Sequence, residues 1–160
     1  MPDSGRSGEK LMFRHILIPT DGSKLAAKGV RTGLRLARAL RARVTALYVV
    51  FPYVPPVYSE AALYYAPGRS VKEGMRLYQE QAKKALGRIS SEARKAGVRC
   101  TTRFVTMGQP WQAILRIARS ARCDAIVMGS HGRGGLAGLI LGSETTHVLA
   151  RSRIPVLVVR

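Results

Sequence analysis

A glycine-rich run near the end of the chain, MGSHGRGGLAGLILGSET, constrains what this sequence can fold into more than any other feature. Its glycines and a serine follow the spacing G-x2-G-x9-G-S, at Gly129, Gly132, Gly142 and Ser143. The apolar segment CDAIVM predicts a buried strand before the run, and SETTHVLARS predicts a helix at its end. A strand that leads through a glycine loop into a helix is typical of a phosphate-binding site.

The residue types in this run suit phosphate. Gly129 and Gly132 lack a Cβ, so they can take positive φ and let the backbone approach a bulky anion. The helix that begins near Ser143 offers free N–H groups and the positive end of its dipole. The hydroxyls of Ser143 and Thr145 can add hydrogen bonds to phosphate oxygens.

Two other phosphate motifs match less well. Gly132, Gly134 and Ala137 satisfy the pattern G-x-G-x-x-A, but no acidic residue follows about 20 positions later to hold a ribose. The P-loop pattern G-x-x-x-x-G-K-[ST] is absent, because no lysine follows any of these glycines. Phosphoryl transfer of the kinase or Walker type therefore loses its main support.

Strand and helix patterns alternate along the whole chain, which predicts one α/β domain with a mostly parallel sheet. Strands are expected at about 13–19, 43–51, 98–105, 124–128 and 154–159. Helices are expected from residues 20–23 to about Leu40, over 71–96, from Pro110 onward and over 143–151. Residues 1–10 are predicted to be a disordered tail, and the proline-rich and tyrosine-rich stretch 52–70 a long loop.

Composition limits the class of protein. A chain of 160 residues suits one domain, and its two cysteines, Cys100 and Cys123, indicate buried thiols rather than a disulfide framework or a zinc site. The start MPDSGRSGEK has no apolar leader core, and no run approaches the roughly 18 apolar residues of a membrane span. We therefore expect a soluble, cytoplasmic protein with no membrane insertion.

The net charge of +18 favours anionic ligands but does not choose among them. Lysines and arginines at helical spacing predict a basic stripe on the first helix, which we interpret as a solvated face: Lys24, Lys28, Arg31, Arg35 and Arg38. No recognised nucleic-acid motif accompanies the charge, so the sequence does not favour nucleic acid as a specific partner.

The carboxyl ends of the first and fourth strands are expected to flank the point where chain order reverses, which is where open parallel sheets bind ligands. One end is Pro19-Thr20-Asp21 and the other is Met128-Gly129-Ser130-His131-Gly132. A carboxylate and a phosphate cradle therefore converge. Asp21 suits a ribose hydroxyl, a cation held by phosphates or a helix N-cap, and the residues alone leave these roles open.

The chain resembles universal stress proteins of the ATP-binding subgroup over roughly residues 11–160. The resemblance rests on ILIPTDGS at 16–23, LYVV at 47–50, MGSHGRGGLAGLILGS at 128–143 and the final IPVLVV. It implies a Rossmann-like open sandwich of the adenine nucleotide alpha hydrolase type, with a parallel sheet of five strands in the order 3-2-1-4-5 and helices on both faces. It also implies ATP, with Mg²⁺ or Mn²⁺, between strands one and four, and a homodimer through the last strand, 155–159.

The resemblance assigns roles by position. Asp21 would lie at the ribose and the metal, next to Pro19; Thr20 and Val49 would lie near adenine, and Met128 beneath the base. The phosphates would be held by Gly129, Gly132, Gly142 and Ser143, with Glu144 and Thr145 adjoining and with His131 and Arg133 in the loop. Glu144 departs from the pattern, because a small apolar residue is more usual there. A carboxylate repels triphosphate, so we expect it to face solvent or a bound cation and to strengthen the magnesium dependence of ATP binding.

The sequence favours holding ATP over hydrolysing it. A hydrolase needs a positioned base, and nothing identifiable orients His131, the nearby imidazole. We therefore assign no catalytic residue, although slow ATPase or autophosphorylation activity is compatible with the site. The predicted function is an ATP-binding stress-response or regulatory protein with an unknown downstream protein partner. The alternative is a basic nucleic-acid or partner-binding module with a vestigial nucleotide site.

Overall fold

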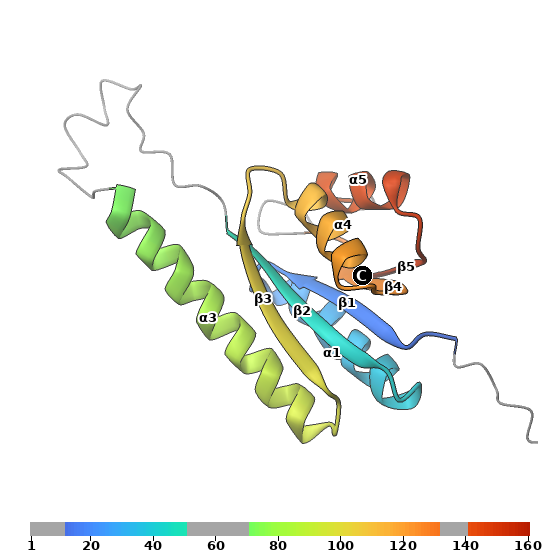
Figure 1. Ribbon diagram of the computed structural model, residues 1–160. Helices are drawn as coiled ribbons and strands as arrows, with labels where there is room; N and C mark the ends of the chain where they lie inside the picture. The colour runs from blue at the N-terminus through green and yellow to red at the C-terminus, as the bar shows by residue number, and fades with distance from the viewer. Residues whose placement is uncertain (1–11, 51–70, 132–140) are drawn as a thin grey trace, which may run out of the picture.

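The computed structural model describes residues 12–50, 71–131 and 141–160. The predicted tail 1–10 and loop 52–70, together with Gly132 and Arg133, lie outside the described residues. The described chain forms a parallel sheet of five strands between two layers of helices (Figure 1).

The order of elements confirms the predicted alternation. The strands are β1 (His15–Thr20), β2 (Arg43–Val50), β3 (Cys100–Thr106), β4 (Ala125–Gly129) and β5 (Val156–Val159). The helices are α1 (Lys24–Ala39), α3 (Val71–Lys95), α4 (Pro110–Ser120) and α5 (Ser143–Arg151). The strand order is β3-β2-β1-β4-β5, and each neighbouring pair is parallel, as the resemblance implies.

The helices cover the sheet in pairs, and each pair closes its own apolar core. Residues of α1 and α3 pack on one face of the sheet, and residues of α4 and α5 pack on the other. Right-handed crossovers keep helices on one face while the chain moves in one direction along the sheet. The chain runs from β1 through β2 to β3 and then returns to β4, so the reversal lies between β1 and β4.

The helix α1 lies so close to the sheet that glycine is required at the contact. A Cβ added to Gly29 would lie 2.7 Å from the backbone nitrogen of Gly129, and one added to Gly33 would lie 2.6 Å from Cδ1 of Ile18. Side chains in a packed interior do not approach this closely, because overpacking strains both neighbours. The backbone of α1 therefore rests directly on the end of β4.

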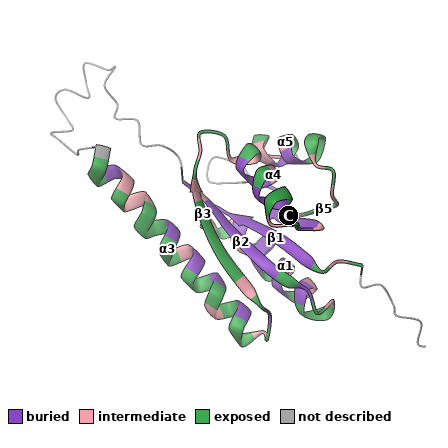
Figure 2. Ribbon diagram, in the orientation of Figure 1, coloured by how far each residue is buried: buried purple, intermediate pink, exposed green. Residues whose placement is uncertain are grey.

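Burial follows the expected pattern with a few differences. The basic stripe on α1 is solvent-exposed, as predicted, and every residue of β1 is buried (Figure 2). Leu34 of α1 and Leu86 of α3 join the core. Leu40 and Trp111 are half-buried. Both lie at helix ends, where the sheet covers a side chain only partly.

Three helices end in the same kind of turn before the next strand. Backbone N–H groups of Ala42, Val98 and Cys123 each donate to a helix carbonyl five residues earlier, at 2.8 Å. The preceding residue has positive φ in each turn: Arg41 at 52°, Gly97 at 70° and Arg122 at 54°. Glycine adopts this conformation freely, whereas a residue with a Cβ is strained by roughly 1–2 kcal/mol. Two of the three turns therefore hold an arginine where glycine fits better.

The other expectations from composition concern the thiols and the membrane. Both cysteines are free, with Cys123 buried and Cys100 half-buried. Burial raises the pKa of Cys123 to about 11, so its side chain stays a neutral thiol. Among the described residues no helix is both long enough and apolar enough to cross a membrane.

The amino end of β1 contains a buried imidazole. His15 is 7% exposed; its Nε2 lies 2.8 Å from Oγ1 of Thr45, and its Nδ1 has no hydrogen-bond partner among the described residues. Burial, followed by the positive charge of Arg43, lowers the pKa of His15 below its ordinary 6.5, while the backbone of Ala121 and the carboxylate of Asp124 oppose this shift. The folded protein therefore holds His15 as the neutral form.

We expect stability to decrease as the pH falls below about 6.5, because His15 binds a proton more readily in the unfolded chain than in the folded one. The contribution of His15 is fully present above its unfolded pKa and is lost as the pH falls toward the lower folded pKa. Urea denaturation at about pH 7.5 and about pH 5.5 measures the loss. His15→Gln should show a smaller loss than the native chain; an unchanged loss in His15→Gln would contradict the assignment.

Candidate functional site

The candidate site lies where the carboxyl ends of β1 and β4 meet the start of α1. β1 ends at Thr20 and β4 ends at Gly129, and the two strands pair in parallel. A Cβ added to Gly129 would lie 3.1 Å from the carbonyl oxygen of Leu25, so the first turn of α1 lies against the end of β4. The structure thus brings the two predicted halves of the site together.

The turn after β1 is ordered by its own side chains. Oγ1 of Thr20 accepts a hydrogen bond from Gly22 N at 3.1 Å, and Oδ1 of Asp21 accepts one from Ser23 N at 2.9 Å. Oγ of Ser23 then accepts from Ala26 N at 3.1 Å, which makes Ser23 the N-cap of α1. Ser23, and not Asp21, therefore caps the helix, and half-buried Asp21 shapes the turn before it.

The glycine loop is closed at its base by a residue that the sequence prediction missed. The backbone nitrogen of Gly142 donates to the carbonyl oxygen of Ser130 at 2.9 Å, so the two ends of the loop meet. The Ser130 nitrogen donates to the carbonyl oxygen of Val159 at 2.8 Å, and its side chain is buried. A polar residue directly after a buried strand is the signal that identifies Ser130. This residue joins β4, β5 and the start of α5.

The start of α5 is available to an anion. Gly142 is the N-cap of α5 and supplies no side chain, and no side chain caps this helix within the described chain. Ser143, the first helical residue, is exposed. The N-terminus of a helix without a cap presents N–H groups and positive partial charge, which together favour phosphate. This feature matches the predicted role of Gly142 and Ser143.

Two predicted phosphate residues make contacts that support the fold. Oγ1 of Thr145 donates to the carbonyl oxygen of Gly129 at 3.2 Å, and Thr145 is buried. Gly129 is the last residue of β4, and it does not have the positive φ that the sequence analysis allowed it, since Gly22 and Gly97 are the described glycines with positive φ. The absence of a Cβ at Gly129 serves the contact with α1.

The carboxylate of Glu144 has a partner within the protein. Its Oε2 accepts a hydrogen bond from the backbone nitrogen of Trp111 at 2.7 Å, so the carboxylate caps the first turn of α4. The local N-cap of α4, Gln109, makes no side-chain bond of this kind. The positive end of α4 therefore holds the half-buried side chain of Glu144. Nearby, the guanidinium of Arg151 lies 4.8 Å from the centre of the Trp111 ring, which further joins α4 to α5.

The remaining predicted site residues that the structure describes lie in the core, in β1 and at the start of the glycine loop. Met128 is buried in the core between the sheet and the pair α4 and α5, and Val49 is half-buried beside it in that cluster. Pro19 is buried in β1, next to Thr20. His131 is half-buried at the start of the loop, with its Nδ1 3.0 Å from Oγ of Ser130.

A metal would have to rely on few protein ligands. No group of three or more His, Cys, Asp and Glu side chains suited to a metal ion occurs in residues 12–50, 71–131 and 141–160. One carboxylate, Asp21, lies at the candidate site. This donor set fits a cation that is held mainly by phosphate oxygens and water, which is how Mg²⁺ is commonly bound.

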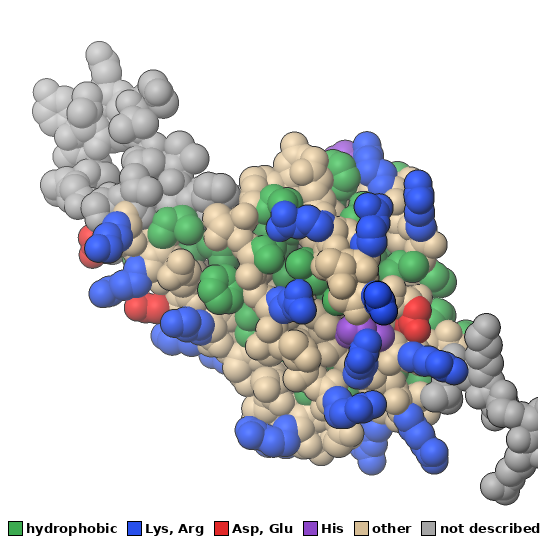
Figure 3. Space-filling view, viewed as in Figure 1, with side chains coloured by type: hydrophobic (Ala, Val, Ile, Leu, Met, Phe, Trp, Pro, Cys, Tyr) green, Lys and Arg blue, Asp and Glu red, His purple; other side chains and the backbone are tan. Residues whose placement is uncertain are grey.

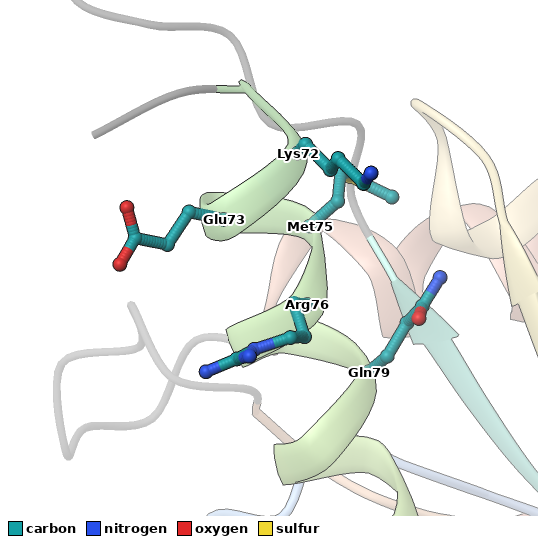
Figure 4. A pocket seen from close by; sticks show the side chains of 5 residues that line it. All are labelled: Lys72, Glu73, Met75, Arg76 and Gln79. Carbon is teal, nitrogen blue, oxygen red and sulfur yellow. The ribbon is translucent and has the colours of Figure 1, made fainter. Parts of the chain in front are cut away.

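A pocket of about 450 Å³ lies elsewhere, along the first turns of α3 (Figure 4). The described residues that line it are Lys72, Glu73, Met75, Arg76 and Gln79. None of the predicted site residues is among them. The candidate site is therefore defined by its polar groups and helix ends and not by this pocket.

Known proteins share this arrangement. The model of the universal stress protein family matches residues 12–160. Universal stress protein MJ0531 of Methanocaldococcus jannaschii is 32% identical over 158 residues, which cover 97% of this chain and 86% of that protein. The solved structure of the universal stress protein UspA from Lactobacillus plantarum has the same fold, with a TM-score of 0.76 at 24% identity over 92% of this chain and 97% of that one. A solved universal stress protein in complex with cAMP has a TM-score of 0.64 at 25% identity over 92% of this chain and 97% of that one. This chain therefore belongs to the universal stress protein family.

Proposed function

We propose that this protein binds ATP at the carboxyl ends of β1 and β4 and acts as a nucleotide-dependent regulator in a stress response. The observation that supports it best is the uncapped start of α5, which stands at the base of the glycine loop. The family relationship and the relative in complex with cAMP support a nucleotide in this class of fold.

The described residues suggest how the ligand would be held. The N–H groups at the start of α5 and the hydroxyl of Ser143 would bind phosphate oxygens. Asp21, in the turn opposite, would meet the ribose or a cation that the phosphates hold. Gly132 and Arg133, which lie outside the described residues, remain our candidates for the middle of the loop.

We propose a binding role without ordinary catalytic turnover. Hydrolysis of ATP needs a base that is held near the attacking water and a cation at the γ-phosphate. His131 is the imidazole at the loop, and its Nδ1 is engaged by the neighbouring Ser130 hydroxyl. We therefore propose no set of catalytic residues. In this proposal the binding of the nucleotide is itself the regulatory signal.

The first prediction from the proposed function concerns the start of α5. Ser143→Asp places a carboxylate at an exposed first helical position, where it suits the helix dipole but repels phosphate. We expect ATP affinity to fall by about tenfold or more, which corresponds to about 1.4 kcal/mol or more, while thermal stability is kept or raised. Isothermal titration calorimetry with Mg-ATP measures the affinity.

Gln112→Glu is the matched control, because it adds the same charge to the first turn of α4, where the residue is exposed. Its ATP affinity should equal that of the native protein. Native protein that binds no ATP would overturn the proposed function, and Ser143→Asp with native affinity would exclude α5 from the site.

The second prediction concerns Glu144, whose carboxylate caps α4. Glu144→Ala leaves the Trp111 N–H without its partner, so we expect the free energy of unfolding to fall by about 1–2 kcal/mol. The ratio of ATP affinities with and without Mg²⁺ should match the native ratio, because the carboxylate faces α4. Urea denaturation followed by the fluorescence of the chain's one tryptophan gives the stability. A changed magnesium ratio at native stability would restore the cation role for Glu144.

The third prediction concerns assembly. β5 is an edge of the described sheet and pairs with β4 alone, and Leu157 on it is 45% exposed. The carbonyls of Pro155 and Val159 accept hydrogen bonds from Ile126 of β4 and from Ser130, which follows β4. The backbone groups of Val156 and Val158 therefore face the free edge. We propose that a second copy pairs with this edge and forms a homodimer, which would cover its unpaired groups.

Val158→Pro removes an edge N–H without touching a bond to β4, so we expect it to convert dimer to monomer with the fold kept. Light scattering after size-exclusion chromatography at micromolar concentration measures the mass. Leu149→Ser, which changes an exposed residue on α5, should remain dimeric. A monomeric native protein, or a dimeric Val158→Pro variant, would count against the proposed interface.

A further inference from the structure

An unusual set of arginines stands at the amino ends of the strands, at the opposite end of the sheet from the proposed nucleotide site. We call this end of the sheet its amino edge, and the end at the proposed site its carboxyl edge. An exposed arginine stands just before every strand, and in sheet order these residues, here called the arginine row, are Arg99, Arg41, Arg14, Arg122 and Arg153. Neighbouring strands lie about 4.8 Å apart, so the row extends over about 19 Å. In Figure 3 the blue side chains gather at the lower right, where the strands of Figure 1 begin.

Backbone hydrogen bonds fix the spacing of the row. Arg43 N donates to the carbonyl oxygen of Arg14 at 3.0 Å, and Val44 N donates to that of Arg99 at 2.8 Å. On the other side, Arg14 N donates to the carboxylate of Asp124 at 2.8 Å. The segments that hold the arginines are therefore tied to one another at the entry to the sheet, and only the side chains remain free to move.

Within the part of the chain that the structure describes, acidic residues do not neutralise this edge. Asp124 is the acidic residue in the segments that lead into the strands, which are residues 12–14, 40–42, 96–99, 121–124 and 152–155. Its two carboxylate oxygens accept the backbone N–H groups of Arg14 and His15 at 2.8 and 3.0 Å. Among the described residues no salt bridge involves a member of the row, since the described ion pair, Arg76 with Glu80, lies on α3. The positive charge is thus left for a partner.

Helix dipoles explain other basic residues here, but not the row. Arg38, Arg94 and Arg119 stand in the last turns of helices, where a cation is favourable for the helix itself. Arg41 and Arg122 come after those turns and hold positive φ, at the position that Gly97 fills in the third turn. Glycine would relieve this backbone strain. Arginine at such a position indicates that its side chain has a function of its own.

The chemistry of the row suits a chain of phosphates. Guanidinium groups bind phosphate with two parallel hydrogen bonds, and duplex DNA has one negative charge for about every 1.7 Å of its axis. Protein partners are usually anchored by large apolar or aromatic side chains, and the row has none; of the described large apolar residues that are exposed, Met12 alone lies in these segments. We propose that the arginine row binds the phosphate backbone of a nucleic-acid duplex without reading its sequence.

This inference extends beyond the proposed ATP site and does not depend on it. The sequence has no recognised nucleic-acid motif, which disfavours specific recognition. The row requires none, since contacts to the backbone do not depend on the bases. The two sites lie at opposite edges of one sheet, because the nucleotide residues follow the strands and the row precedes them.

The test uses the full chain and a fluorescent DNA duplex of about 20 base pairs, with binding followed by fluorescence polarisation over a series of salt concentrations. Arg41→Gly with Arg122→Gly removes two charges and relieves two strained turns, so loss of the fold does not explain a loss of binding. We expect an affinity about tenfold lower or more, and a slope of log affinity against log salt that falls by about 2. Arg41→Lys with Arg122→Lys should keep the native slope.

Arg31→Gln with Arg35→Gln is the matched control, because it removes two exposed charges from the middle of α1. It should keep the native slope. The proposal is overturned if this control loses as much binding as the glycine pair, if the glycine pair binds like the native chain, or if the native chain does not bind the duplex. Two other ligands are tested in the same way, phosphatidylserine vesicles and polyglutamate. If either binds more tightly than DNA and the glycine pair abolishes that binding, the row is assigned instead to a membrane or to an acidic protein, respectively.

Discussion

The contact between the backbone of α1 and the end of β4 is the constraint on which the rest of the structure depends. It exists because Gly29 and Gly129 meet without side chains, so that a Cβ on Gly29 would lie 2.7 Å from the nitrogen of Gly129. The contact brings the turn at Asp21 beside the end of β4, although about a hundred residues separate them in the chain. A larger residue at Gly29 would move α1 away from the sheet and separate the two halves of the site.

A second consequence follows for the polar groups around this contact. Once β4 ends against α1, the carbonyl of Gly129 is bound by the Thr145 hydroxyl, and Ser130 is bound to both Val159 and Gly142. These bonds fix the position of α5 by its first turn and leave its N-cap without a side chain. The free positive end of α5 is therefore a product of the packing around Gly129, and so is its position opposite Asp21.

Much of the fold could be predicted from the sequence, because the apolar runs and helical spacings are local patterns that each element contains within itself. The ends of the strands, the parallel sheet and the convergence of β1 with β4 follow from these patterns and from the rules of crossover connections. The resemblance to a known family added the strand order, which local patterns do not determine. The uncapped start of α5 at Gly142 and Ser143 was predictable in the same way, because a glycine before a helix supplies no capping side chain.

The contacts that local patterns did not reveal share one physical cause: they concern residues whose partner is distant in sequence. Glu144 was assigned to the phosphates because it follows Ser143, yet its carboxylate binds a backbone nitrogen 33 residues away, at the start of a different helix. Gly129 was assigned a turn conformation, yet its role is contact with α1, and Ser130 was overlooked because its partners are in β5 and α5. A charged residue beside a motif therefore indicates a ligand only after the nearby helix ends have been considered as competing partners.

The two edges of the sheet also differ in the way their charge arises, and this difference is a property of the parallel fold. At the carboxyl edge, positive potential comes from the backbone at the start of α5, and it needs glycine and small residues so that an anion can approach. At the amino edge the strands begin and the helices end, so the backbone of the helices offers negative partial charge and any positive potential must come from side chains. The arginines before the strands supply it, and at Arg41 and Arg122 they do so against the preference of the backbone. In the two proposals, one sheet thus separates an edge for the phosphates of a small ligand from an edge for the phosphates of a long polyanion.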